Sequence, residues 1–241
     1  MKNKNAIVTG ATKGIGLAIA EMLLKEGFTV TLTYAHDEMS ALACSECLSA
    51  ISSDYEILRV NQANKEDMHK FALKMREKGH VDCLVCNAGM TSRNQLSNIT
   101  EEDWECVMQV NVNSNVYLIR DLYDVIPWGS RIVFIGSLMG VFPHSVSLSY
   151  GVTKAAVHAL AQNLVKVFEG TGTTVNTVVP GFTETDWQKN KPLEIRNNIC
   201  AKTAVRRFAQ PEEIADAVLF CLNNSFVNGS LIEVNGGYCF K

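Results

Sequence analysis

The chain alternates between short apolar runs and longer segments in which apolar residues recur every three or four positions. Short runs rich in β-branched residues are typical of buried strands, and three-to-four spacing is typical of amphipathic helices. The predicted strands are residues 5–9, 29–34, 56–60, 82–86, 131–135, 174–179 and 231–234. The predicted helices run from about Ile15 to Gly27 and over residues 37–50, 65–78, 101–125, 150–169 and 211–222.

This alternation predicts the fold class. Strands that alternate with helices through short connections form an α/β fold, with a parallel sheet flanked by helices on both faces. No linker, repeat or low-complexity segment interrupts the pattern, so residues 1–241 are predicted to form a single domain. The irregular stretch at about 181–208 mixes polar residues with Trp187 and Leu193, which indicates a partly helical lid over a substrate.

Composition and charge narrow the class of protein. Of the 241 residues, 47% are hydrophobic and 20% are charged, which is typical of a globular protein. The net charge of -3 argues against a nucleic-acid or anionic-membrane surface. No apolar run reaches the ~18 residues of a membrane-spanning helix, so a cytoplasmic protein without membrane contact is expected.

The cysteines include two CxxC pairs, Cys44/Cys47 and Cys83/Cys86. Such pairs can hold zinc, but no glycine or histidine knuckle surrounds them, and the second pair lies in a predicted buried strand. We therefore expect no metal site and interpret the cysteines as reduced thiols that pack as small hydrophobic groups.

A glycine-rich turn follows the first predicted strand. Its sequence, TGATKGIG at residues 9–16, leads directly into the first predicted helix. Glycine lets the backbone approach a pyrophosphate, and a helix N-terminus offers unpaired N–H groups at the positive end of its dipole. A plain structural turn is the alternative, but the position after the first strand of an alternating chain favours nucleotide binding.

A second cluster of polar residues follows the predicted strand 131–135. Tyr150 and Lys154 are four positions apart and share one helical face, and Ser137 lies just beyond the strand. A tyrosine titrates near ~10, but a neighbouring ammonium favours the phenolate and lowers that pKa. Ser137 can donate a hydrogen bond to a carbonyl oxygen beside this tyrosine and lysine.

These motifs, in this order, resemble the short-chain dehydrogenase/reductase family over essentially the whole chain. The matching pieces are residues 9–16, Asn87-Ala88-Gly89, Asn111, Ser137, Tyr150 with Lys154, Pro180-Gly181 and residues 234–237. The resemblance implies a Rossmann fold with seven parallel strands in the order 3-2-1-4-5-6-7. It also implies an NAD(P)-dependent oxidoreductase that is commonly a homotetramer.

The resemblance also implies roles for four residues. Tyr150 would protonate the carbonyl oxygen, or deprotonate the alcohol in the reverse direction. Ser137 would orient that oxygen, and Lys154 would bind the nicotinamide ribose and lower the pKa of Tyr150. Asn111 would hold a water molecule that links Lys154 to solvent.

The cofactor contacts implied by the same resemblance come from several loops. They are Gly10, Thr12, Lys13, Gly14, Ile15, Gly16, Tyr34, Asn61, Asn87, Ala88, Gly89, Tyr150, Lys154, Pro180, Gly181, Thr183 and Thr185.

The choice between cofactors depends on the end of the second predicted strand. An acid there would accept hydrogen bonds from the ribose hydroxyls and favour NAD, but the first acid, Asp37, comes only after His36. Lys13 stands where members that use NADP carry a basic residue, so NADP(H) is predicted to be preferred over NAD(H). The alternative is that Lys13 is only a solvated loop residue and that Asp37 turns back to the ribose.

Within the family, residues 180–186 resemble the 3-oxoacyl-[acyl-carrier-protein] reductases. This implies reduction of a 3-oxoacyl thioester, possibly on acyl carrier protein, in fatty acid biosynthesis. A dehydrogenase for a steroid, sugar or other secondary alcohol stays open, as does a nucleotide-binding regulator without turnover. These alternatives differ in whether the cofactor is consumed and with which ketone.

Other residues suggest roles that we do not favour. His36 and His144 could act as bases, but Tyr150 and Lys154 already supply proton transfer, so solvated positions or contacts with a substrate or phosphate are expected. Trp187 and Phe182 could line the substrate pocket. The acidic run 101–103 is predicted to start a helix, with Thr100 as its N-cap.

Overall fold

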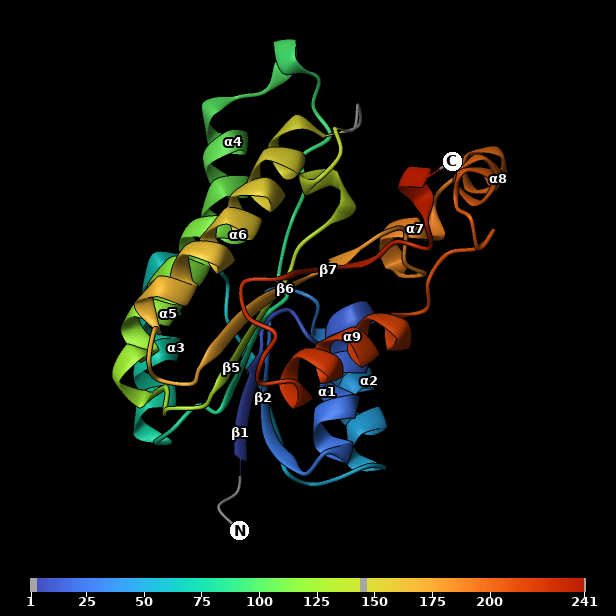
Figure 1. Cartoon of the computed structure of the whole chain (residues 1–241). Helices are drawn as coiled ribbons and strands as arrows, with labels where there is room; N and C mark the ends of the chain where they lie inside the picture. Colours follow the sequence, from blue (N-terminus) through green and yellow to red (C-terminus); the bar gives the residue numbers. More distant parts are fainter. Residues whose placement is uncertain (1–3, 144–146, 241) are drawn as a thin grey trace.

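Seven parallel strands form the centre of the structure, a computed structural model that describes residues 4–143 and 147–240 (Figure 1). The strands are β1 (Lys4–Val8), β2 (Phe28–Tyr34), β3 (Tyr55–Arg59), β4 (Cys83–Cys86), β5 (Arg131–Ile135), β6 (Thr174–Pro180) and β7 (Leu231–Val234). Their order is β3-β2-β1-β4-β5-β6-β7. The predicted strand order and the parallel sheet are therefore confirmed.

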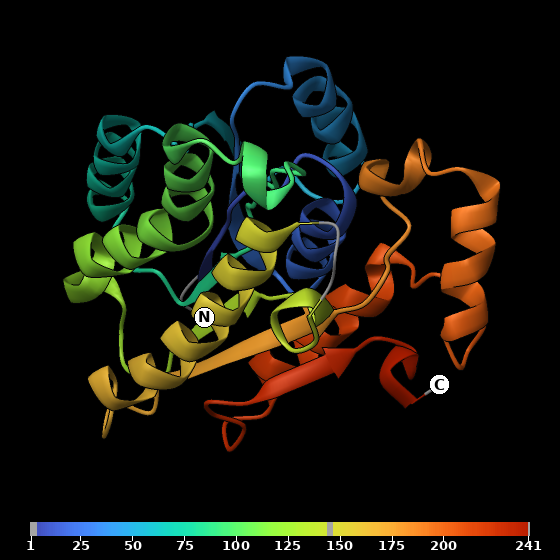
Figure 2. The same ribbon diagram turned by 90° about the horizontal axis from the view of Figure 1, so that it is seen from above.

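Helices cover both faces of this sheet (Figure 2). They are α1 (Gly14–Lys25), α2 (Glu38–Ser49), α3 (Lys65–Glu77), α4 (Glu101–Met108), α5 (Ser114–Leu122), α6 (Leu148–Val167), α7 (Asp186–Lys189), α8 (Leu193–Lys202) and α9 (Pro211–Asn223). Short 3-10 turns lie at Leu96–Asn98, Tyr123–Val125, Leu138–Gly140 and Tyr238–Phe240. No helix within 4–143 and 147–240 is long and apolar enough to cross a membrane.

The core has two parts because successive strand residues point to opposite faces of the sheet. On β1, Ala6 and Val8 pack with α1, α2 and α9, whereas Ile7 packs with α3, α5 and α6. Figure 1 shows these two groups of helices on opposite sides of the strands. The buried apolar side chains on both faces hold the strand ends in fixed positions, on which the site depends.

The same alternation separates Cys83 from Cys86. Cys83 packs in the part of the core under α1 and α9, and Cys86 packs in the part under α3 and α5. Their sulfurs therefore lie on opposite faces and cannot share one metal ion. Burial raises the pKa of the Cys83 thiol to about 12, so it packs as a neutral group.

The predicted single helix over residues 101–125 is wrong in one respect. α4 ends at Met108, a π-helical turn spans Gln109–Asn113, α5 follows, and a 3-10 turn covers Tyr123–Val125. The predicted N-cap is confirmed, because the Thr100 hydroxyl accepts a hydrogen bond from the Asp103 N–H at 3.1 Å. The π turn places one extra residue in a helical turn and so rotates the following side chains.

The carboxyl ends of all the strands meet at one edge of the sheet, the upper edge in Figure 1. α7 and α8 stand beside this edge, in the stretch 181–208 that the sequence predicts as a lid. This stretch is partly helical, as predicted. Parallel α/β folds bind their ligands at this edge, outside the strand ends.

Candidate active site

A cavity of about 1020 Å³ lies over the carboxyl edge of the sheet. Loops that follow β1 to β6 line it, together with the lid. The cavity brings together every residue predicted to contact the cofactor, from Gly10 to Thr185, and also Ser137. Asn111 is the one predicted site residue that does not line it.

The glycine turn opens into one end of this cavity. α1 starts at Gly14 with no side-chain cap and no acid in its first turn, whereas Asp37, Asn64 and Thr100 cap later helices. Its first N–H groups are therefore available to an anionic ligand. At Gly16 a Cβ would lie 2.6 Å from the Asn87 amide nitrogen, so only glycine allows this close approach. An uncapped helix behind a close glycine turn fits the pyrophosphate of a dinucleotide.

Lys13 lies in an ion pair at the end of the cavity nearest β2. Its ammonium is 2.6 Å from the Asp37 carboxylate and 3.6 Å from the Asp186 carboxylate of the lid. Hydrogen bonds from Lys13 and Ser40 hold the pKa of the Asp37 carboxyl well below its usual range. Lys13 is therefore paired with an acid and is not only a solvated loop residue. The 2′-phosphate of an incoming NADP(H) would compete with Asp37 for the Lys13 ammonium. His36 also lines this end of the cavity.

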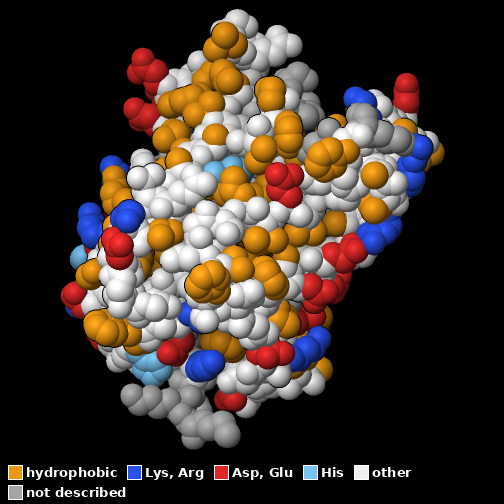
Figure 3. Space-filling view, viewed as in Figure 1, with side chains coloured by type: hydrophobic (Ala, Val, Ile, Leu, Met, Phe, Trp, Pro, Cys, Tyr) orange, Lys and Arg blue, Asp and Glu red, His pale blue; other side chains and the backbone are white. Residues whose placement is uncertain are grey.

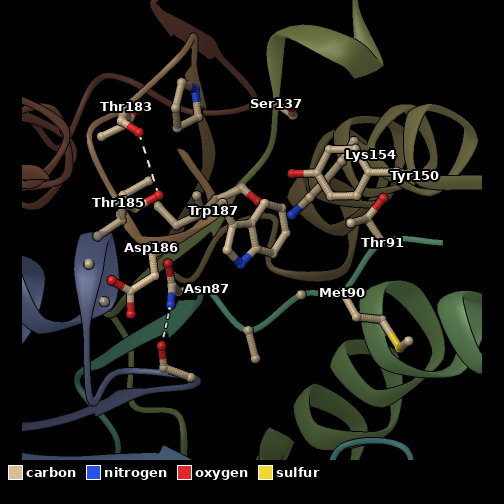
Figure 4. Close-up of a pocket in the computed structure, with 18 of the residues that line it drawn as sticks. Asn87, Met90, Thr91, Ser137, Tyr150, Lys154, Thr183, Thr185, Asp186 and Trp187 are labelled. Atoms are coloured by element: carbon tan, nitrogen blue, oxygen red, sulfur yellow. Dashed lines mark hydrogen bonds between the residues drawn. The ribbon is translucent and has the colours of Figure 1, made fainter. Parts of the chain in front are cut away.

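Tyr150, Lys154 and Ser137 meet at the opposite end (Figure 4). The Lys154 ammonium is 5.6 Å from the centre of the Tyr150 ring and donates a hydrogen bond of 2.7 Å to the Ile135 carbonyl. Trp187 of the lid stands edge-on to Tyr150, with 5.8 Å between ring centres. The end of β5, one turn of α6 and the lid therefore converge on one phenol.

The protonation of this cluster follows from its burial. The pKa of Tyr150 is not lowered as the sequence predicts: desolvation raises it to about 12, and a hydrogen bond with Ser137 partly offsets this effect. Desolvation lowers the pKa of Lys154 to about 8. Lys154 is only 4% exposed, so its charge is held in a largely water-free environment. A neutral phenol beside a lysine that titrates close to neutral pH is suited to proton transfer.

Asn111 lies behind the cavity wall, in the π turn. Its amide nitrogen donates to the Met90 carbonyl at 2.9 Å and to the Thr153 hydroxyl at 2.8 Å. Its amide oxygen accepts a hydrogen bond from the Met90 N–H at 2.8 Å. That oxygen and the Lys154 ammonium both lie within 3.5 Å of the point where a Cβ on residue 89 would stand. Asn111 therefore ties α6 to the loop after β4, beside Lys154.

His158 is a site residue that the sequence analysis missed. It lies one helical turn beyond Lys154 and is only 5% exposed. Its Nε2 accepts a hydrogen bond of 3.4 Å from the Ser137 N–H, which places its proton on Nδ1. Burial, followed by the Lys154 charge, lowers its pKa to about 4. The four-residue spacing after Lys154 was the available signal in the sequence.

The loop after β4 is fixed by a second contact that the sequence did not indicate. Ser147 caps α6, and its hydroxyl accepts hydrogen bonds from the Tyr150 N–H at 3.3 Å and from the Thr91 hydroxyl at 2.9 Å. Phe182 lines the cavity, as suggested, and packs against Phe208. His144 lies outside the residues that the structure describes.

Comparison with known proteins identifies the class. A family profile described as "Enoyl-(Acyl carrier protein) reductase" matches residues 10–239. The chain belongs to the short-chain dehydrogenase/reductase family and is an NAD(P)-dependent oxidoreductase.

Relatives in this family include 3-oxoacyl-[acyl-carrier-protein] reductase FabG of Vibrio cholerae, 34% identical over 98% of each chain. FabG of Escherichia coli K12 is also 34% identical, over 98% of this chain and 97% of that protein.

Solved structures are similar over almost the full length. A short-chain dehydrogenase from Burkholderia cenocepacia J2315 in complex with NADP has a TM-score of 0.91, with 27% identity and 98% of each chain covered. Pseudomonas aeruginosa RhlG with NADP has a TM-score of 0.89, with 28% identity, and covers 98% of this chain and 96% of that one. The Rossmann fold is therefore shown by both the sheet order and these neighbours.

Proposed function

We propose that the protein is an NADPH-dependent reductase of 3-oxoacyl thioesters. One observation carries the proposal: Tyr150, Lys154 and Ser137 converge at one end of a cavity whose other end is an uncapped, glycine-lined helix N-terminus. The FabG relatives and the NADP complexes among the structural neighbours support the substrate class and the cofactor.

The proposed chemistry divides between the cofactor and the chain. When bound, the nicotinamide cofactor supplies the hydride that reduces the carbonyl carbon. Tyr150 donates its phenolic proton to the carbonyl oxygen, and the Ser137 hydroxyl donates a hydrogen bond that orients the same oxygen. Lys154 holds the nicotinamide ribose and favours the phenolate that remains. We assign the Asn111 amide oxygen, which lies beside Lys154, as the group that binds the water molecule connecting Lys154 to solvent.

The apolar residues near Tyr150 support an acyl substrate. Met90, Cys106, Phe142 and Trp187 line this end of the cavity, where they offer contact area and few hydrogen-bonding groups. We assign the stretch 181–208 as the lid that closes over the substrate and excludes water from the proton transfer.

We also propose that the chain assembles as a homotetramer. Figure 3 shows hydrophobic side chains gathered over α4 and α6, where Leu148 and Val152 are 46% and 42% exposed. Trp128, Phe226 and Phe240 are more than 80% exposed elsewhere. Exposed apolar surface of this extent is typical of subunit contacts. Light scattering of the purified protein tests the assembly, and a monomer would contradict it.

The function is tested by following the oxidation of NADPH and NADH with acetoacetyl thioesters, steroids and simple ketones. We expect turnover with the thioester and NADPH. Tyr150→Phe removes the transferable proton but keeps the ring, so turnover falls by at least ~10²-fold while NADPH binding persists. Near-normal turnover by this variant would exclude Tyr150 as the acid.

A further inference from the structure

Besides Lys154 and Lys202, two basic side chains line the cavity without an ion pair to any described residue. Arg93 comes from the loop after β4, and Lys191 comes from the short connection between α7 and α8. Neither side chain has an ion pair or a hydrogen bond with any residue in 4–143 or 147–240. The loop after β4 and the lid thus place two unneutralised cations on the wall of one cavity.

Three other cations of the lid, Lys189, Arg196 and Arg207, form ion pairs, so acids are not simply lacking there, although Lys202 and Arg206 have no ion pair with a described residue. Arg196 forms an ion pair of 2.6 Å with Glu184 and also lies over the Phe208 ring, at 4.4 Å from its centre. Lys189 pairs with Asp186. Lys191, which is partly buried, differs from Lys189 and Arg196 in forming no ion pair with a residue that the structure describes.

The charges around Lys191 repel it. Burial lowers the pKa of Lys191, and the positive charges of Arg93 and Arg196 lower it further. Like charges brought together in a partly buried place destabilise the empty site, and a bound anion would relieve this repulsion. The two acids that line the cavity, Asp37 and Asp186, both lie against Lys13 at the β2 end.

We propose that Arg93 and Lys191 bind a phosphate group on the carrier arm of the thioester substrate. This inference rests on the proposed function, because the carriers of acyl thioesters bear a phosphate on their pantetheine arm. The Arg93 guanidinium presents a planar fork to two phosphate oxygens, and Lys191 adds a point charge from the lid. Contact with both residues would join the lid to the loop after β4 once the substrate is bound.

The test compares two substrates that differ in the phosphate. Acetoacetyl-4′-phosphopantetheine carries it, and acetoacetyl-N-acetylcysteamine is neutral. We expect Arg93→Gln and Lys191→Gln each to raise KM for the phosphorylated thioester about tenfold with little change in kcat, the low end for charge-assisted contacts of partly exposed groups. KM for the neutral thioester and for NADPH should not change. Lys189→Gln, an equal charge change on the same lid, is the matched control.

Binding separates this inference from the proposed function. Calorimetry of the NADP⁺-loaded protein compares 4′-phosphopantetheine with pantetheine, for the wild type and both variants. A phosphate preference that disappears in the variants supports the anion site, even if no thioester is reduced and the proposed function fails. Thioester reduction without any phosphate preference overturns the anion site alone. A rise in KM for NADPH instead of the thioester would assign both residues to the cofactor and also overturn it.

A final comparison identifies the source of the phosphate. Acetoacetyl-coenzyme A and acetoacetyl-carrier protein both present the pantetheine arm, so both should lose affinity in Arg93→Gln. A loss confined to one of them assigns the site to that carrier, and a loss for neither overturns the phosphate contact.

Discussion

The buried ammonium of Lys154 should reduce the stability of the folded protein, and substitution by methionine measures the cost. The pKa of Lys154 is lowered from 10.5 to about 8 in the folded state. The folded protein therefore releases this proton before the unfolded chain does. The penalty for burying the charge is fully present below pH 8 and disappears as the pH rises toward 10.5.

The magnitude follows from the two pKa values. Between pH 7 and pH 10 the free energy of unfolding of the wild type should rise by roughly 2–3 kcal/mol relative to Lys154→Met, which has no proton to release. The variant also loses the hydrogen bond from Lys154 to the Ile135 carbonyl. That loss is a nearly constant offset, because neutral and charged lysine both donate, so the change with pH isolates the charge.

The assay is urea unfolding at one protein concentration, at pH 7, 8, 9 and 10. Lys166→Met is the matched control, because Lys166 lies on the same helix with 79% of its side chain exposed. Its difference from the wild type should stay within about 0.5 kcal/mol across this range. A difference between wild type and Lys154→Met that does not change with pH would refute the argument that burial sets this pKa.

Three further predictions concern other parts of the site. Asp37→Asn removes the closer of the two acids beside Lys13 and leaves Asp186 at 3.6 Å, so the preference for NADPH over NADH should rise about tenfold, whereas Lys13→Ala should remove most of it. Initial rates with each cofactor check this, and unchanged ratios would exclude the pair of Lys13 and Asp37 from cofactor choice. Without ligands, the lid 181–208 should exchange its amide hydrogens faster than the sheet, and this exchange should slow when NADPH and a thioester are bound. Uniformly slow exchange in the absence of ligands would contradict a mobile lid. Gly136→Ala would place a Cβ in steric conflict with His158 Nε2, so urea unfolding should show a loss of stability of about 1–3 kcal/mol. A neutral result would mean that the His158 ring can move aside.

Much of the fold could be predicted because its signals are local. The apolar runs and the glycine turn at residues 9–16 depend on short stretches of chain, and the structure confirms the strands and their order. The motif residues come together in one cavity for the same reason, since each lies at a strand end or on the first turns of a helix. Asn111 differs because it reaches the site through a π turn, which apolar spacing alone does not indicate.

Contacts between distant segments could not be predicted. No pattern in the sequence places Arg93 beside Lys191, and only the folded loops bring them to one cavity. In the sequence, His158 cannot be told from any other polar residue of a helix, because only the fold brings its Nε2 to the Ser137 N–H. The ion pair of Lys13 with Asp37 likewise depends on how the loop after β2 folds back toward the glycine turn.

The π turn at Gln109–Asn113 makes this helix sensitive to length as well as to composition. Converting it to a regular α-helical turn at unchanged length would rotate everything beyond it by about 100°. Leu118 and Leu122, which are now in the core, would then turn away from it. Surface loops of the fold can gain or lose residues at little cost. This internal turn cannot gain a residue without the same rotation, so among diverging copies of the gene we expect no insertions within 109–113 and no substitution of Asn111.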